Sequence, residues 1–172
     1  MDYSHAIQTM ASLYSKGRLV PYVGAGLSAG YCRLFGDLLS ELEKRLKIST
    51  VGSRKVIQRA DAVYRALQVG KASVSTRILA QALLCSKVPS KIPRATIELA
   101  RIWWPLVITT NYDDLFVQQS HLSHDHKIRY SVLGRSQIDC TRLLLSMEQP
   151  SKPILWALHG FIGGQHFDKS CG

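Results

Sequence analysis

The sequence has no apolar run that approaches the roughly 18 residues needed to cross a membrane. Its first residues, Met1–His5, also lack the basic and then apolar order of a secretory signal peptide. These two absences predict a protein that is cytoplasmic and makes no membrane contact.

Cysteine is scarce, and its spacing does not suit cross-linking or metal binding. The four cysteines are Cys32, Cys85, Cys140 and Cys171. They form no C-x-x-C pair, so neither a disulfide framework nor a zinc ribbon is predicted. Three nearby histidines, His121, His124 and His126, have the chemistry of metal ligands. They have no fourth ligand at a suitable distance, so we interpret them as part of a solvated loop and predict no metal site.

Internal repeats and low-complexity tracts are absent as well, and 46% of the 172 residues are apolar. A chain of ~150 residues can bury roughly 70% of its unfolded surface, which is enough for a hydrophobic core. We therefore predict one folded domain that spans residues 1–172.

The net charge of +10 is concentrated in one part of the chain. From Lys44 to Arg101 there are 13 Lys or Arg and two acids, a balance of +11, whereas all other residues together give −1. Such a field attracts nucleic acid, acidic protein surfaces or anionic nucleotides. The alternative interpretation is a set of solvated helix faces.

Helical periodicity alternates with short apolar runs, which predicts an α/β fold. Short runs rich in β-branched residues suit the buried strands of a parallel sheet. The predicted strands are residues 19–23, 106–110, 128–133 and 154–158, and the predicted helices are residues 4–17, 38–46, 56–67, 74–83 and 97–102. The helices between the first two strands, about residues 37–102, form a basic helical insert in this interpretation.

Glycines follow the first predicted strand directly, in the segment Gly24–Ser28. Ligands of open α/β sheets collect at the carboxyl ends of strands. Without Cβ atoms at Gly24 and Gly26, backbone N–H groups can approach a phosphate closely, and Ser28 can add a hydroxyl donor. A tight turn between a strand and a helix explains the same residues without any ligand.

Two further strands also end in polar residues. Asn111 and Asp113 follow the second strand and can hydrogen-bond sugar hydroxyls, although both are also favoured helix caps. His159 leaves the last strand just before Gly160 and can act as a general acid or base. A histidine whose hydrogen bonds are satisfied within the core is the structural alternative for this position.

The order of these three motifs resembles the Sir2 superfamily. The segment Leu19–Ser28, which reads LVPYVGAGLS, is most similar to the prokaryotic SIR2-like NADase domains of anti-phage defence systems. The resemblance is strong over residues 17–30 and 104–116 and moderate over residues 154–160. It implies a Rossmann-like domain that binds NAD⁺ and breaks the bond between nicotinamide and ribose.

The resemblance also assigns roles to particular residues. Asn111 and His159 match the catalytic asparagine and histidine of the family. Residues that match positions binding the dinucleotide are Gly24, Ala25, Gly26, Ser28, Thr110 and Asp113. NAD⁺ is expected as substrate, and a homo-oligomer or a sensor or activator protein as partner.

The sequence departs from the deacetylating members of the superfamily. The loop Gly30–Asp37 lacks their Gly-Ile-Pro-Asp-Phe-Arg motif, and their four-cysteine zinc module has no counterpart. Both differences favour simple NAD⁺ cleavage over deacetylation of acyl-lysine. The family continues after its histidine with further strands, so we expect the C-terminal part of the sheet to be missing and the chain to be a minimal or truncated module.

Three functions follow as hypotheses. The first is an NAD⁺ glycohydrolase that depletes NAD⁺ in anti-phage defence. The second is a catalytically weak module that senses NAD⁺ or a related nucleotide. The third is a basic domain that binds nucleic acid or a protein partner through Lys44–Arg101.

Overall fold

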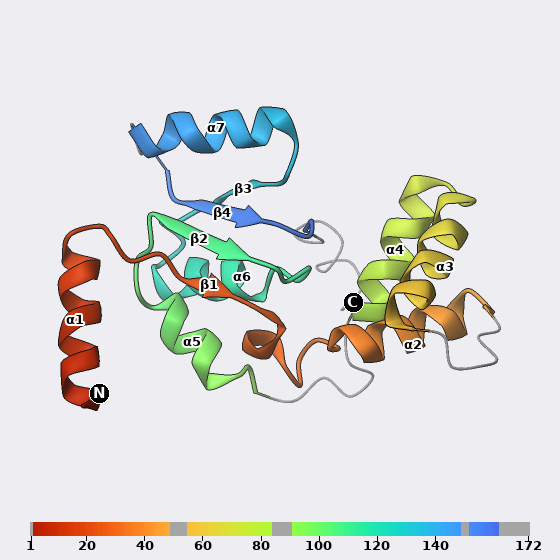
Figure 1. The fold of residues 1–172 in the computed structure, drawn as a ribbon, viewed down its shortest axis with the longest axis horizontal. Helices are drawn as coiled ribbons and strands as arrows, with labels where there is room; N and C mark the ends of the chain where they lie inside the picture. Colours follow the sequence, from red (N-terminus) through yellow and green to blue (C-terminus); the bar gives the residue numbers. More distant parts are fainter. Residues whose placement is uncertain (1, 49–54, 84–90, 149–151, 162–172) are drawn as a thin grey trace.

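The described residues form an α/β structure built on one four-stranded parallel sheet (Figure 1). The computed structural model describes residues 2–48, 55–83, 91–148 and 152–161. The sheet has the order β1-β2-β4-β3. Its strands are β1 (Tyr22–Val23), β2 (Leu106–Thr109), β3 (Ser131–Leu133) and β4 (Ile154–Ala157). The prediction of a parallel sheet flanked by helices is confirmed. The described residues do not include Cys85 or Cys171. They also do not include residues 162–172, so the expectation that the C-terminal part of the sheet is missing lies outside them.

The two central strands are the most buried part of the sheet. Val107 of β2 and Leu155 of β4 are paired in register and are 0% and 2% exposed. The apolar runs that predict these strands therefore reflect burial on both faces. The first strand is shorter than predicted, because Pro21 has no N–H to donate and contributes only its carbonyl, which accepts from the N–H of Ile108 at 3.0 Å.

Helices cover both faces of the sheet. On one face, α5 (Arg94–Ala100) and α6 (Leu115–Ser123) pack against each other and enclose a core that contains Val107 and Leu155. On the other face, α7 (Gln137–Glu148) inserts Leu143 against Leu133 and Ile154. The alternation of side chains along β2 and β4 thus separates two apolar layers.

A second group of helices lies beyond the carboxyl ends of the strands (Figure 1). It consists of α2 (Phe35–Arg45), α3 (Val56–Gln68) and α4 (Ala72–Leu83), which we call the helical cluster. These helices have a core of their own around Leu38, Leu42 and Val63. The helical insert is expected to span about residues 37–102. Of its helices, α5 does not join the helical cluster but packs against the sheet.

The N-terminal helix α1 (Tyr3–Ser15) lies toward the amino ends of the strands (Figure 1). Asp2 caps it by accepting the Ser4 N–H at 3.3 Å, so the helix begins one residue before the predicted start at residue 4. The predicted stop at Gly17 is confirmed, since its φ of 64° is a left-handed conformation. In the part of the chain described, no helix is both long and apolar enough to span a bilayer.

The central sheet should dominate stability. Leu155→Ala removes a 2%-exposed side chain between two layers and should lower the free energy of unfolding by about 2–5 kcal/mol. Leu145→Ala, the same substitution at a 61%-exposed position on α7, should change it by about 0.5 kcal/mol or less. Urea unfolding measures both. Equal losses would contradict the burial assigned to β4.

Candidate functional site

A cavity of about 390 Å³ lies where the strands meet the helical cluster. Residues that follow all four strands line it, and the other wall comes from the segment before α2 and from α2 and α4 themselves. The lining residues are Ala25, Ser28, Cys32, Arg33, Phe35, Leu38, Leu83, Thr110, Asn111, Tyr112, Asp113, Arg135 and His159. The parallel sheet therefore brings the three predicted motifs to one edge, as expected for this fold class.

Ser28 joins two of these motifs through buried hydrogen bonds. Its hydroxyl donates to Oδ1 of Asp113 at 2.8 Å and accepts from Nδ2 of Asn111 at 3.2 Å. Ser28, Asn111 and Asp113 are 2%, 7% and 8% exposed, so water does not compete for these contacts. We call this arrangement the Asn111–Ser28–Asp113 chain.

The direction of these hydrogen bonds follows from the groups present. An ionised carboxylate only accepts, and a serine hydroxyl has one proton to give. Ser28 must therefore accept from the amide nitrogen of Asn111, which leaves Oδ1 of Asn111 to face other partners. That oxygen is buried and has no hydrogen-bond partner among the described residues. An orphaned acceptor lining a cavity fits a ligand hydroxyl or a water molecule.

The backbone around Asn111 is fixed as well. Its N–H donates to Oγ1 of Thr109 at 3.0 Å, directly after β2. Asn111 does not cap α6, because that helix begins at Leu115 with Asp114 as its cap residue. The cap interpretation is wrong for Asn111.

Asp113 has a partly structural role. Its Oδ1 also accepts from the N–H of Leu115 at 3.1 Å, at the start of α6. The cap residue itself is Asp114, so Asp113 supports the start of α6 without being its cap. Burial raises the pKa of the Asp113 carboxyl, although the hydrogen bonds from Ser28 and Leu115 oppose the rise.

The glycines of the first motif are not required by the backbone or by packing. Gly24 and Gly26 have no left-handed φ, unlike Gly30. A Cβ at Gly24 would meet Oγ1 of Thr110 at an ordinary 3.6 Å, and one at Gly26 would meet nothing within 4 Å. Residues Ala25–Ser28 form a short 3₁₀ turn that sequence patterns did not predict. The protein's own packing therefore does not explain these glycines. A ligand that approaches the backbone through this open space would explain them.

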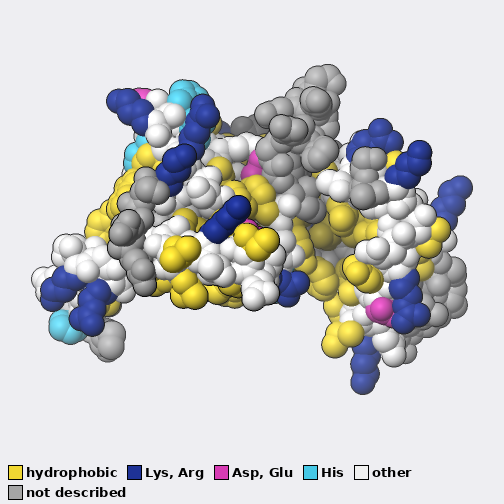
Figure 2. Space-filling view, turned by 90° about the horizontal axis from the view of Figure 1, so that it is seen from above, with side chains coloured by type: hydrophobic (Ala, Val, Ile, Leu, Met, Phe, Trp, Pro, Cys, Tyr) yellow, Lys and Arg dark blue, Asp and Glu magenta, His cyan; other side chains and the backbone are white. Residues whose placement is uncertain are grey.

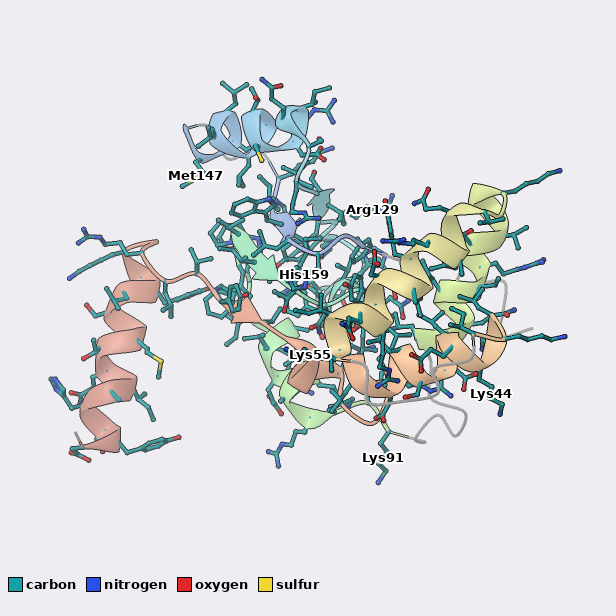
Figure 3. All side chains as sticks on the ribbon, turned by 45° about the vertical axis from the view of Figure 1, so that its right-hand side comes forward. Lys44, Lys55, Lys91, Arg129, Met147 and His159 are labelled. Carbon is teal, nitrogen blue, oxygen red and sulfur yellow. The ribbon has the colours of Figure 1, made fainter. Side chains whose placement is uncertain are left out.

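His159 lies at the mouth of the cavity, between the strand ends and the helical cluster (Figure 3). The side chain is exposed, so the interpretation as a core histidine is wrong. Its ring is 6.3 Å from that of Tyr112 between centroids. His159 and Asn111 line the same cavity, so the imidazole is a candidate general acid or base.

Two arginines of the cavity were not predicted from the sequence. Arg33 is held by a 2.7 Å hydrogen bond to the Ala82 carbonyl and lies 3.8 Å from Glu41. Arg135 is the second residue after β3, so the strand-end rule could have identified it. Its neighbour Gly134 is fixed from two sides, by the Trp156 indole at 2.9 Å and the Asp139 carboxylate at 3.1 Å.

The histidine group predicted as a solvated loop is partly helical. His121 belongs to α6, and its ring packs 4.5 Å from that of His126. Within the described residues, no group of three or more His, Cys, Asp or Glu side chains could hold a metal ion.

Comparison with known families gives a match that begins just before β2. The family model described as a SIR2-like domain matches residues 105–170. Over these residues the chain is similar to a SIR2-like domain. The match confirms the predicted relationship to the Sir2 superfamily and contains Asn111, Asp113, Arg135 and His159. No curated protein matches the chain.

The SIR2-like domain indicates a function related to NAD, and many such domains are NAD-utilising enzymes. The relationship to anti-phage NADases in particular remains a prediction. The glycine motif at Gly24–Ser28 lies outside the matched residues, yet the structure brings Ser28 into contact with Asn111 and Asp113.

In the folded structure, acidic residues offset part of the positive charge of the basic segment Lys44–Arg101. Acids just before it, Glu41 and Glu43, pair with Arg45 and Arg59. Figure 2 shows Lys and Arg side chains spread over several sides of the helical cluster. Other segment cations with a carboxylate partner are Arg65, Arg94 and Arg101.

Asp113→Asn should not destabilise the domain at neutral pH. The raised pKa means that the folded state binds the proton more tightly than the unfolded state. The carboxyl thus contributes stability that is full below its unfolded pKa of about 4 and is lost as pH rises through the folded pKa. Asparagine keeps the Oδ1 acceptor but does not ionise.

Urea midpoints between pH 4 and pH 8 test this expectation. The variant should be at least as stable as the parent at pH 7, and its stability should fall less as pH rises. A loss of more than about 1 kcal/mol at pH 7 would contradict it, because it would mean that the ionised carboxylate stabilises the fold.

Proposed function

We propose that this chain hydrolyses NAD⁺ to nicotinamide and ADP-ribose. The observation that carries the proposal is the orphaned Oδ1 of Asn111, a residue that lines the cavity and whose amide nitrogen is held by Ser28. This residue lies in the part of the chain that is similar to a SIR2-like domain. In this reaction the bond between ribose C1′ and the nicotinamide nitrogen breaks, and a bond from C1′ to a water oxygen forms. The water loses one proton, which passes to a base and then to solvent.

Asn111 has the right chemistry to position the ribose or the water. Its free oxygen accepts a hydrogen bond from a hydroxyl proton, and its amide is held in place by Ser28. A positioned neutral group can favour the oxocarbenium-like transition state without a large reorganisation. His159, exposed at the cavity mouth, is the group we propose to accept the proton of the water.

The remaining groups suit the anionic half of the substrate. Arg33 and Arg135 are the cations of the cavity, and a guanidinium binds phosphate oxygens in a bidentate manner. We propose that Gly24, Ala25 and Gly26 approach the pyrophosphate, while Thr110 and Asp113 support the ribose side. The Ser28 hydroxyl already donates its hydrogen bond to Asp113, so in this arrangement Ser28 acts through Asn111.

A second candidate is a module that binds NAD⁺ without cleaving it. This candidate is favoured by His159, for whose imidazole the described residues provide no hydrogen-bonded orienting group. Participation in anti-phage defence, a cytoplasmic location and assembly with itself or with a sensor protein are further proposals that rest on the sequence resemblance alone.

Removing either proposed reacting group should abolish most turnover without unfolding the protein. We expect Asn111→Ala to lower the rate by about 10²–10³ and His159→Ala by about 10²–10⁴. His5→Ala, at an exposed histidine on α1, is the matched control and should keep the parental rate. Chromatography of released nicotinamide and the thermal midpoint should be measured for each variant.

The outcomes separate the candidates. Parental turnover in both variants would contradict the assignment of this pair. Saturable NAD⁺ binding by the parent with no nicotinamide release, with and without an added activator, would favour the second candidate.

Gly26→Ala tests the glycine motif separately from the fold. Since the added methyl meets no protein atom within 4 Å, the thermal midpoint should stay unchanged. A ligand approaching the backbone would meet it, so KM for NAD⁺ should rise by about tenfold, or ~1.4 kcal/mol. Gly36→Ala, which also meets nothing within 4 Å, is the control. Equal KM values for the two variants would remove Gly26 from the site.

A further inference from the structure

A second cavity, of about 520 Å³, lies at the opposite edge of the sheet. Its lining includes Pro105, Ser131 and Pro153, which stand at the amino ends of β2, β3 and β4. The candidate NAD site lies at the carboxyl ends of the same strands, and the two cavities share no lining residue. The other residues that line the second cavity are Trp103, Lys127, Ile128, Arg129, Tyr130 and Lys152.

Its charges have one sign. Lys127, Arg129 and Lys152 line the cavity, and no acidic residue does among the residues that the structure describes. None of the three forms an ion pair in the part of the chain that is described, whereas several arginines of the helical cluster are paired with carboxylates. Three cations that line one cavity, with no counter-charge among the described residues, make it suited to an anionic ligand.

An exposed indole stands beside these cations. Trp103 is 47% exposed, while its neighbour Trp104 is buried and meets the Tyr14 ring edge-on at 5.1 Å. The backbone at this point is fixed, because the Tyr14 hydroxyl donates to the Trp103 carbonyl at 2.7 Å and the Tyr130 hydroxyl donates to that of Trp104 at 3.1 Å. A large exposed aromatic on a fixed backbone is a stacking surface.

Backbone hydrogen bonds join the strand ends that line the cavity. The Ser131 N–H donates to the Pro153 carbonyl at 2.8 Å, and the Ile154 N–H donates to the Pro105 carbonyl at 2.9 Å. The strand ends therefore bind each other, and the cationic side chains are the groups left to contact a ligand. The volume is within the ~300–1,000 Å³ usual for small-molecule sites.

We propose that this cavity binds a nucleotide, with its phosphates on Lys127, Arg129 and Lys152 and its base stacked on Trp103. Arginine can engage phosphate oxygens in a bidentate manner, and lysine supplies compact charge. The site is separate from the proposed NAD⁺ cleavage site and does not depend on that activity.

The experiment measures the binding of ATP and of inorganic pyrophosphate to the full chain by calorimetry at two salt concentrations. The main variant is Lys127→Gln/Arg129→Gln. The matched control is Lys44→Gln/Arg77→Gln, which removes the same charges from exposed positions of the helical cluster. Asn111→Ala identifies any binding at the other edge, and thermal midpoints confirm that each variant is folded.

We expect the parent to bind both probes, more weakly at high salt, and the main variant to bind each at least about tenfold more weakly. The control and Asn111→Ala should bind within about twofold of the parent. Trp103→Ala should weaken ATP by about fivefold or more and leave pyrophosphate unchanged, and Trp103→Phe should restore most of the ATP affinity.

Several results would overturn the proposal. Absence of ATP binding at millimolar concentration would do so, as would parental affinity in the main variant. Loss of binding in Asn111→Ala would assign the nucleotide to the other edge. If Trp103→Ala weakened neither probe, the cavity would bind phosphate groups without recognising a base.

Discussion

The candidate site depends on a single buried proton, the one that Ser28 donates to Asp113. Because water is excluded and the carboxylate cannot donate, this proton fixes the orientation of the Asn111 amide. Its Nδ2 donates to Ser28, and its Oδ1 has no partner among the described residues. The cost is a carboxyl group whose pKa is raised by burial. Burial makes the ionised form of this carboxyl less favourable in the folded protein than in the unfolded chain. Such a cost is typical of residues retained for function rather than for stability.

The short parallel strands explain why one sheet offers two separate cavities. β2 and β4 have four residues each and span only about 13 Å. Their carboxyl ends present Asn111 and His159 toward the helical cluster, and their amino ends begin beside the cationic cavity. The parallel arrangement keeps the two sets of groups at opposite edges of the sheet.

The sequence predicts the parts of this structure that local patterns determine. Buried apolar runs identify β2 and β4, and the strand-end rule places Asn111 and His159 at one edge. The pattern did not identify α7, whose apolar residues include both buried Leu143 and exposed Leu144, so its helical periodicity is blurred. The contact of Ser28 with Asp113 joins residues 85 positions apart, and no local pattern encodes it.

The most direct test of the central claim uses the fact that Asn111 is the single asparagine of the chain. Labelling with ¹⁵N-asparagine gives one side-chain amide signal, which can be followed in NMR spectra as a function of pH and of added NAD⁺. This signal should shift as Asp113 titrates, and the shift should disappear in Asp113→Asn and in Ser28→Ala. Added NAD⁺ should displace the signal saturably. A signal that ignores both pH and NAD⁺, or a pH step that persists unchanged in Ser28→Ala, would contradict it.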